Sequence, residues 1–201
     1  MTILPREFFA QPTLTVAQNL LGQHLVRAVE GQHLRGRIVE TEAYLGPEDT
    51  ACHASKGRTP RTEVMFGPPG RTYVYLIYGL HYMLNLVTEV ESFPAAVLIR
   101  AIEPLAGLDL MRQHRQRQPS QTMPLRQIGN GPGKLCQALR IDKSLNGWDV
   151  TTGQTLWLEA VEPLPKMAIA SGPRLGIDYA QAADRAAPWR FWQRDNPFIS
   201  K

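Results

Sequence analysis

Residues 71–85 read RTYVYLIYGLHYMLN and join two apolar, aromatic-rich runs through Gly79. Two such runs separated by a glycine-containing turn are typical of an antiparallel β-hairpin. Tyr73 and Tyr75 then share one face, whereas Tyr78 lies at the turn and can project from the hairpin. Aromatic stripes are more often core than ligand platforms, but a tyrosine at a tight turn is poorly placed for burial. The stretch therefore predicts a hairpin whose tip can act as a wedge or a stacking surface.

Strand-like segments flank this hairpin on both sides. Turn signals around β-branched and aromatic residues predict strands at 24–29, 34–45, 72–78, 82–87, 95–102, 155–160, 173–177 and 189–193. Helices are predicted at 12–22, with Thr15 as N-cap and Gly22 as the stop, from Pro104 onwards, and at 134–140. Strands, then helices, then strands again indicate the α+β class, in one domain spanning residues 1–201 with a largely antiparallel sheet.

The composition suits one sizeable hydrophobic core. The 201 residues are 43% hydrophobic and 20% charged. No apolar run reaches the roughly 18 residues of a membrane span, and the first residues, MTILPREFFAQPT, lack the apolar region of a signal peptide. Cys52 and Cys136 fit neither a disulfide framework nor a zinc site, and the five histidines show no metal-ligand spacing. We expect a cytoplasmic protein with reduced thiols, no membrane association and no metal.

Positive charge is concentrated between Met111 and Leu145. This basic window contains seven basic residues and one acidic residue, Asp142. Its net charge is therefore +6, whereas that of the whole chain is +4. The basic residues are Arg112, Arg115, Arg117, Arg126, Lys134, Arg140 and Lys143. The window suits a polyanion such as nucleic acid, although a solvated helix face is the commoner explanation of an isolated basic stretch. Residues 112–124, RQHRQRQPSQTMP, are predicted to form a mobile loop.

Residues 37–49, RIVETEAYLGPED, carry the first sign of chemistry. On a strand, Glu40, Glu42 and Tyr44 share one face because side chains alternate with period two. A solvated sheet face is the usual meaning of such a pattern. A general base in a cleft is a second interpretation, and a glycosidase acid/base pair is a third, since residues two apart on a strand lie about 6.6 Å apart. Spacing alone does not choose among the three.

Residues 129–135, GNGPGKL, do not form a nucleotide-binding loop. A Walker loop needs four residues before its Gly-Lys pair and then Ser or Thr, whereas here three intervene and Leu135 follows. A helix N-terminus with Lys134 nearby remains a candidate site for one backbone phosphate. An ordinary Gly-Pro turn before a helix explains the same residues equally well.

Several motifs together resemble the alkyladenine (3-methyladenine) DNA glycosylase family, which includes the human alkylpurine glycosylase. They are RIVETEAYLGPEDTACHASKGRTPRTEVMF, YVYLIYGLHYMLN, LIRAIEPL, GPGKLCQAL, RLGI and PWRFW, in family order from about Leu20 to the C-terminus. The resemblance implies a DNA repair enzyme that flips damaged purines out of double-stranded DNA and hydrolyses their N-glycosidic bond, leaving an abasic site. It also implies a curved antiparallel sheet with a protruding hairpin that enters the minor groove, no cofactor, a water nucleophile and a monomer. A bacterial protein of this kind would associate with the nucleoid.

The resemblance assigns roles residue by residue. Glu42 matches the glutamate that deprotonates the water, Arg100 the arginine that holds it, and Leu175 the position whose carbonyl completes its contacts. The base-binding positions are Tyr44 and His53 on one face, Tyr75 on the other, and Asn85 against the exocyclic amine of guanine. The expected DNA contacts are Tyr78, which fills the vacated stack, with Leu80, His81, Arg58, Thr59, Arg61 and, from the helix N-terminus, Lys134.

Two departures from the family pattern affect DNA contacts. His81 stands where the human enzyme has an aromatic residue, and the loop CHASKGRTPR is one residue shorter than its human counterpart. Two other functions also fit parts of the sequence. They are a non-catalytic binder of damaged DNA or of RNA, and a carbohydrate hydrolase that uses Glu40 and Glu42 as a pair. The sequence does not rank 3-methyladenine, 7-methylguanine, hypoxanthine and ethenoadenine as substrates.

Overall fold

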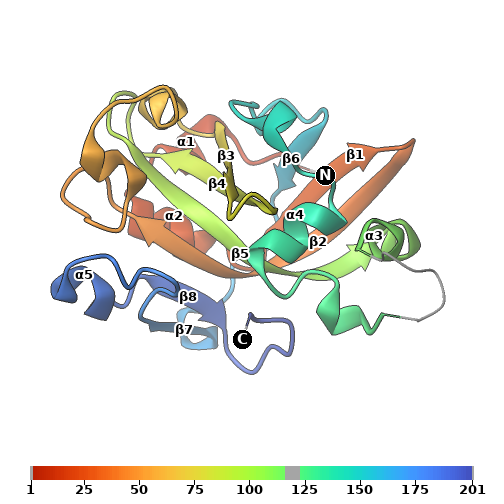
Figure 1. Cartoon of the computed structure of the whole chain (residues 1–201). Coiled ribbons are helices and arrows are strands. Elements are labelled where there is room, and N and C mark those ends of the chain that lie inside the picture. The colour runs from red at the N-terminus through yellow and green to blue at the C-terminus, as the bar shows by residue number, and fades with distance from the viewer. Residues whose placement is uncertain (1, 116–122, 201) are drawn as a thin grey trace.

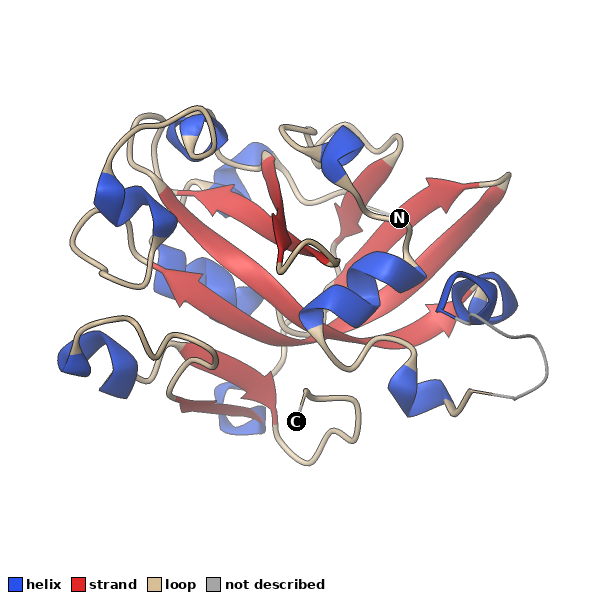
Figure 2. Cartoon of the chain, viewed as in Figure 1, coloured by secondary structure: helices blue, strands red, loops and turns tan. Residues whose placement is uncertain are grey.

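The computed structural model describes residues 2–115 and 123–200, and its centre is a curved sheet (Figure 1, Figure 2). Its strands are β1 His24–Val29, β2 Gln32–Tyr44, β3 Thr72–Ile77, β4 His81–Thr88, β5 Ala95–Ala106, β6 Leu156–Glu159, β7 Ile169–Gly172 and β8 Arg190–Gln193. The main order is β3-β4-β5-β2-β1-β6, while β8 pairs with β2 and β7 with β8. Every pairing among these named strands is antiparallel. The predicted α+β class is confirmed.

The two longest strands, β2 and β5, run side by side through the middle of the sheet, and their pairing is irregular. Register shifts lie next to Gly36, between Ile38 and Glu40, and between Glu40 and Thr41. Such bulges bend a strand and change the direction of the side chains beside them. At Gly36 the chains approach closely, since an added Cβ would lie 2.6 Å from the side chain of Ile102. After this bend β2 leaves β1 and pairs with β8 through residues 40–42.

Helices cover the sheet and fill its core. They are α1 Arg6–Phe9, α2 Thr13–Asn19, α3 Leu108–Arg115, α4 Pro132–Ala138 and α5 Ala182–Ala186, with short 3-10 turns η1 His53–Lys56, η2 Glu63–Phe66, η3 Leu125–Gln127, η4 Lys143–Leu145 and η5 Lys166–Ala168. Helix α2 packs on β2 and β5, and α4 packs on β4 and β5. The hydroxyl of Thr41 donates a hydrogen bond to the Ala17 carbonyl of α2 at 2.8 Å. Glu40 and Glu42, which alternate with Thr41, therefore face away from α2.

The helix predicted from Pro104 is wrong at its start, because β5 continues to Ala106 and α3 begins at Leu108. Pro104 pairs with Gly36 at a register shift, where a residue without an N–H is tolerated in a sheet. Gly107 then turns the chain with a φ of +75°, and an added Cβ there would lie 2.3 Å from the Leu34 side chain. Tertiary pairing with β2 thus overrides the helix-start signal of proline.

Three other predictions are corrected. Residues 173–177 form a loop rather than a strand, and the strand of this region is β7, which ends at Gly172. The α2 helix starts at Thr13 rather than after Thr15. The N–H and hydroxyl of Thr13 both donate to the Glu89 carboxylate, at 2.6 and 2.8 Å, so the cap comes from a distant loop. The loop predicted for residues 112–124 is wrong at its start, because α3 continues to Arg115; residues 116–122, including Arg117, lie outside the described residues.

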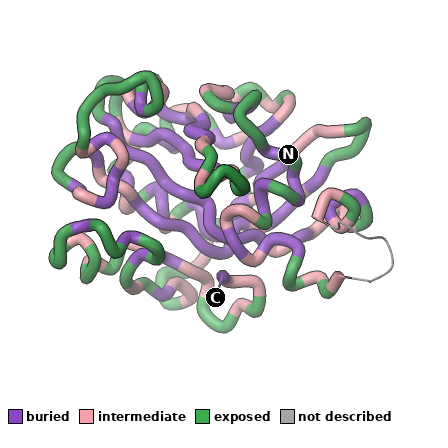
Figure 3. Tube along the Cα trace, in the orientation of Figure 1, coloured by how far each residue is buried: buried purple, intermediate pink, exposed green. Residues whose placement is uncertain are grey.

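The sheet and the tip of its hairpin differ in solvent exposure. Figure 3 shows the strands largely buried, whereas the turn between β3 and β4 is exposed. Within residues 2–115 and 123–200, no helix combines the length and apolar character that crossing a membrane requires.

Candidate active site

A cavity of about 690 Å³ lies between the end of β2, the β3–β4 hairpin and the loops that follow β2 and β7. This volume is in the range of small-molecule sites. Its lining brings together nine of the predicted site residues from six segments of the chain. They are Tyr44, His53, Thr59, Arg61, Tyr75, Tyr78, Asn85, Arg100 and Leu175. The predicted residues Glu42, Arg58, Leu80, His81 and Lys134 do not line it.

Glu42 is fully buried directly behind this lining. Its Oε1 accepts a hydrogen bond from the Leu175 N–H at 2.8 Å and pairs with Arg100 Nη1 at 3.1 Å. Its Oε2 accepts a hydrogen bond from the Tyr44 hydroxyl at 2.9 Å. All three partners line the cavity, so the carboxylate lies one layer behind the cavity lining. We predicted a role for the Leu175 carbonyl, but the contact that the structure defines is made by its N–H.

Burial raises the pKa of the Glu42 carboxyl, and this desolvation outweighs the lowering effects of Arg100, the Leu175 N–H and the Tyr44 hydroxyl. The nearby charge of Glu40 raises the pKa further. A carboxylate whose pKa is raised by burial accepts a proton more readily than an exposed one. Perturbed groups of this kind gather at functional sites.

Glu40 lies on the same side of β2 but is closed off from the cavity. It is fully buried, and its Oε1 accepts a hydrogen bond from Arg100 Nε at 3.1 Å. Arg190 Nη1 lies 3.4 Å from the same oxygen. Ser200 supplies the remaining contacts, at 2.6 Å from its N–H and 2.9 Å from its hydroxyl. Glu40 and Glu42 therefore share one arginine while facing different surroundings.

Aromatic rings form one wall of the cavity. The His53 and Tyr75 ring centroids are 4.7 Å apart in an edge arrangement, and His53 Nδ1 lies 2.9 Å from the Tyr73 hydroxyl. Burial lowers the pKa of His53 to about 4, with smaller contributions from Arg61 and Lys56. The imidazole is therefore neutral at physiological pH. Arg61 lies over the Tyr75 ring, 5.1 Å from its centroid.

Asn85 lines the cavity and also fastens the hairpin. Its Nδ2 donates a hydrogen bond to the Tyr73 carbonyl at 3.0 Å across the β3–β4 pair. The amide side chain therefore holds the two strands of the hairpin together. The gating of guanine stays a prediction.

The hairpin tip is built as the sequence predicts. Tyr78 and Gly79 both have positive φ, +52° and +68°, and the Leu80 N–H donates to the Ile77 carbonyl at 3.1 Å. Two successive positive φ values define the tight turn that matches strand twist. Tyr78 is 86% exposed and Leu80 72% exposed. The turn therefore presents two apolar side chains to solvent.

The tip end of the hairpin lies against α4. A Cβ added at Gly133 would lie 3.0 to 3.3 Å from atoms of the His81 side chain. Glycine at this position therefore permits His81 to lie against the first turn of α4. Lys134, on the next position, is exposed, and its Nζ donates to Asn130 Oδ1 at 3.0 Å.

The other predicted DNA-contacting residues are partly engaged with the protein itself. Arg58 is exposed and forms a bidentate ion pair with Glu63, in which Nε and Nη2 donate to Oε2 and Oε1 at 2.8 and 2.6 Å. Thr59 exchanges hydrogen bonds with Thr62. In the basic window, Arg112 pairs with Asp109, Arg115 donates to Gln137 and Arg140 pairs with Glu30. Asp109 and Glu30 offset part of the positive charge of the window, whereas the neutral Gln137 only orients Arg115.

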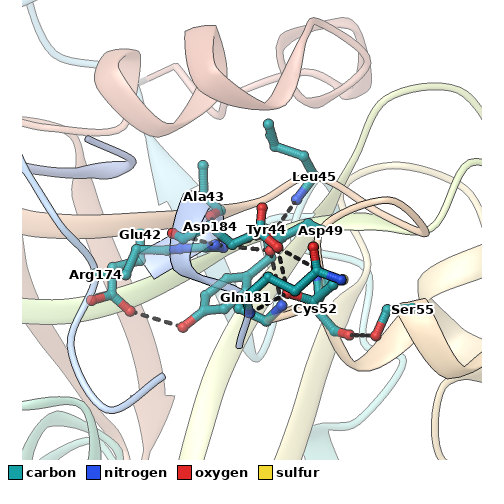
Figure 4. Close-up of polar contacts among 12 residues, drawn as sticks. Glu42, Ala43, Tyr44, Leu45, Asp49, Cys52, Ser55, Arg174, Gln181 and Asp184 are labelled. Atoms are coloured by element: carbon teal, nitrogen blue, oxygen red, sulfur yellow. Dashed lines mark hydrogen bonds and ion pairs between the residues drawn. The ribbon is translucent and has the colours of Figure 1, made fainter. Parts of the chain in front are cut away.

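Sequence reasoning missed a buried ion pair that frames the site (Figure 4). Arg174 donates to both carboxylate oxygens of Asp49 at 2.6 and 2.8 Å and to the Ala43 carbonyl at 2.9 Å. Its guanidinium lies over the Tyr44 ring at 4.7 Å and over the Trp189 ring at 4.9 Å. Because Arg174 precedes Leu175, this pair holds the loop that delivers the Leu175 N–H to Glu42. Both residues lie in the quoted family motifs, but their pairing spans 125 positions and leaves no local signal.

Within residues 2–115 and 123–200, no three His, Cys, Asp or Glu side chains gather as a metal site.

Comparison with known proteins identifies the family of this chain. The family model described as methylpurine-DNA glycosylase (MPG) matches residues 7–197. The chain belongs to the methylpurine-DNA glycosylase family. A relative from Desulfitobacterium hafniense is 50% identical over 204 residues, covering 100% of this chain and 99% of its own length. Another, from Methanocella arvoryzae, is 49% identical over 201 residues, covering 100% and 97%. Both carry the name "Putative 3-methyladenine DNA glycosylase".

Proposed function

We propose that this member of the methylpurine-DNA glycosylase family releases alkylated or deaminated purines from double-stranded DNA by hydrolysis. Water attacks C1′ of the flipped nucleotide while the bond from C1′ to the glycosidic nitrogen breaks, and its electron pair leaves with the base. Glu42 accepts a proton of the water. The products are the free base and an abasic site, and the step uses no cofactor.

The observation that carries the proposal is the buried Glu42 carboxylate, which is bonded to three residues that line the cavity. A carboxylate offers about four lone-pair directions. Among the described residues, Arg100 and Leu175 take two on Oε1 and Tyr44 takes one on Oε2. A direction on Oε2 is left for water, beside the Tyr44 hydroxyl. The negative charge also stabilises the positive charge that develops on the sugar as the bond breaks.

The aromatic wall supports binding of a flat, alkylated base. A base stacked between two rings needs two van der Waals separations of about 3.5 Å each, roughly 7 Å in all. His53 and Tyr75, now 4.7 Å apart, must therefore separate to sandwich one between them. Because His53 is neutral, it can stack on a cationic alkylpurine without charge repulsion. The exposed Tyr78 suits the gap that the flipped nucleotide leaves.

The two other functions are less well supported. A non-catalytic binder gains nothing from burying an ionised carboxylate whose pKa is raised, since that burial costs folding free energy. A paired-carboxylate hydrolase needs both carboxylates to reach the substrate. Neither lines the cavity, but the partners of Glu42 all do, whereas both oxygens of Glu40 are held by donors that include Ser200, away from the cavity lining. Single-carboxylate catalysis by Glu42 fits this arrangement better.

A direct assay tests the proposal. The purified protein is incubated with duplex oligonucleotides that each carry one 3-methyladenine, 7-methylguanine, hypoxanthine or ethenoadenine, and released base and abasic sites are measured. We expect release from at least one duplex. Borohydride should trap no adduct, although Lys56 lines the cavity, because water is the proposed nucleophile. Binding without release from every duplex would favour the non-catalytic alternative, and a trapped adduct would exclude a purely hydrolytic mechanism.

A further inference from the structure

Ser200 follows β8 and lies buried behind the cavity, 8% exposed. Its N–H donates to Glu40 Oε2 at 2.6 Å, and its hydroxyl donates to Glu40 Oε1 at 2.9 Å. The same hydroxyl oxygen accepts a hydrogen bond from Arg100 Nη2 at 3.2 Å. One serine thus contacts both a buried carboxylate and a buried guanidinium.

Glu40 and Ser200 together occupy one edge of the Arg100 guanidinium. Nε donates to Glu40 Oε1 at 3.1 Å, and Nη2 donates to the Ser200 hydroxyl at 3.2 Å. The remaining nitrogen, Nη1, lies 3.1 Å from Glu42 Oε1. A guanidinium is planar and rigid, so fixing the Nε–Nη2 edge also fixes the direction in which Nη1 points.

Stability alone does not explain why these three charged side chains are buried together. Glu40 and Glu42 are both 0% exposed, and Arg100 is 8% exposed. Buried ion pairs contribute little net folding free energy, because desolvation offsets their attraction. The other charged group that faces Glu40 is Arg190, at 3.4 Å. Geometric control of Arg100 explains the burial better than stability does.

We propose that Ser200, acting with Glu40, is a positioning residue that aims Arg100 Nη1 at the carboxylate of Glu42. The proposal rests on the proposed function, in which Glu42 is the base. Without the Ser200 hydroxyl, Nη2 loses this partner and the Nε–Nη2 edge is held through Nε alone, so Nη1 is aimed less closely at Glu42. Neither residue touches the substrate, so binding of the lesion should be spared.

The test is Ser200→Ala, compared with Thr41→Val as a matched control. Thr41 is also a buried hydroxyl in this part of the molecule, but it bonds to Ala17 on the opposite face of β2. We expect Ser200→Ala to lower the single-turnover rate of base release by about 10- to 100-fold, the scale of a small misplacement of a catalytic group. The dissociation constant for lesion DNA should change less than twofold. Thr41→Val should lower thermal stability with a much smaller effect on the rate.

A second readout does not depend on activity. The Glu42 carboxyl can be titrated by carbon NMR in each variant. Arg100 lowers the pKa of Glu42, so loosening Arg100 should raise that pKa in Ser200→Ala. Thr41→Val should leave the titration unchanged. Ser200→Thr, which keeps the hydroxyl and the N–H, should restore both readouts.

The outcomes separate this inference from the proposed function. If Ser200→Ala matches Thr41→Val in rate and in Glu42 titration, Ser200 is a stabilising contact only and the inference is overturned. If Glu42→Gln retains base release, the assignment of Glu42 as the base fails, and the NMR titration still decides whether Ser200 controls Arg100.

Discussion

The main-chain N–H of Leu175 donates a hydrogen bond to Glu42 Oε1 at 2.8 Å and so joins residues 133 positions apart. The loop that carries Leu175 is held by Arg174, whose guanidinium is bonded to Asp49 and stacked on Tyr44. Tyr44 in turn donates to the other oxygen of Glu42. The carboxylate is therefore fixed from both sides by groups that are themselves fixed, which is the preorganisation that a general base needs.

Glu42→Gln should abolish base release and at the same time stabilise the protein at neutral pH. The amide keeps the shape but does not accept a proton, so the rate should fall by at least about 10²-fold. The folded-state pKa of Glu42 is raised, so its contribution to stability is greatest below its unfolded pKa and is lost as pH rises through the folded pKa. The midpoint of thermal unfolding should therefore exceed that of wild type at pH 7 to 8, by an amount that shrinks towards pH 4.

Glu63→Gln provides the control for this substitution. Glu63 is exposed, and its hydrogen bonds from Arg58 lower its pKa, so no stabilisation at neutral pH is expected. Equal or lower stability of Glu42→Gln at pH 7 would contradict the assignment of desolvation as the dominant effect on Glu42.

His53 should titrate near pH 4, and Arg61 should be one cause. Burial is the largest effect and the Arg61 charge the next, so Arg61→Gln should raise the pKa of His53 towards its ordinary value. Because the folded-state pKa is depressed, neutral His53 contributes stability above about pH 6.5 that is lost as pH falls towards 4. NMR of the imidazole protons measures the titration directly.

Arg58→Gln is the matched control, since Arg58 lies in the same loop but is engaged by Glu63. Arg58→Gln should leave the pKa of His53 unchanged. A His53 pKa near 6.5 in the wild-type protein would show that the imidazole is solvated rather than buried against Tyr75.

Asn85→Ala should destabilise the hairpin and also relax the choice of base. Loss of the amide leaves the Tyr73 carbonyl without this partner, at a cost of about 1–3 kcal/mol in the free energy of unfolding. If the side chain also crowds the exocyclic amine of guanine, excision of guanine-derived bases should rise relative to adenine-derived ones. Chemical denaturation and excision assays on both base classes measure the two effects.

Asn146→Ala separates these effects. Asn146 Oδ1 accepts a hydrogen bond from the Val74 N–H at 2.9 Å, so this side chain also fastens β3, but it does not line the cavity. It should destabilise without changing the ratio of the two base classes. If the ratio of guanine-derived to adenine-derived excision is the same in both variants, Asn85 only stabilises the hairpin and does not select the base.

Gly133→Ala should weaken capture of lesion DNA. The new Cβ would lie 3.0 Å from the His81 Cβ and 3.1 Å from its Cγ, so His81 must shift by a few tenths of an ångström, and we expect the hairpin to shift with it. Gly131→Ala is the control in the same turn, because its Cβ would lie 3.6 Å from the Lys134 side chain, an ordinary contact. Binding of a lesion-containing duplex should fall in the first variant and hold in the second. Equal affinities would mean that the contact between His81 and α4 does not orient the hairpin.

Local patterns predicted much of the fold. The alternation and turn signals of residues 71–85 predicted the hairpin and its exposed tyrosine, because side-chain direction in a strand follows from period two. The same rule predicted that Glu40 and Glu42 share a side of β2. Local signals failed at Pro104 and at residues 173–177, where pairing with β2 and the buried ion pair of Arg174 decide the conformation.

The sequence by itself determined which residue types the site contains and which neighbours share a face, since those depend on the backbone geometry of a few residues. Only the tertiary structure decided how the two carboxylates differ. Arg100 reaches Glu40 across 60 positions and Ser200 reaches it across 160, which closes Glu40 off from the cavity. Contacts of this range leave no periodic signal in the chain, because they arise when separate strands and loops pack around one core.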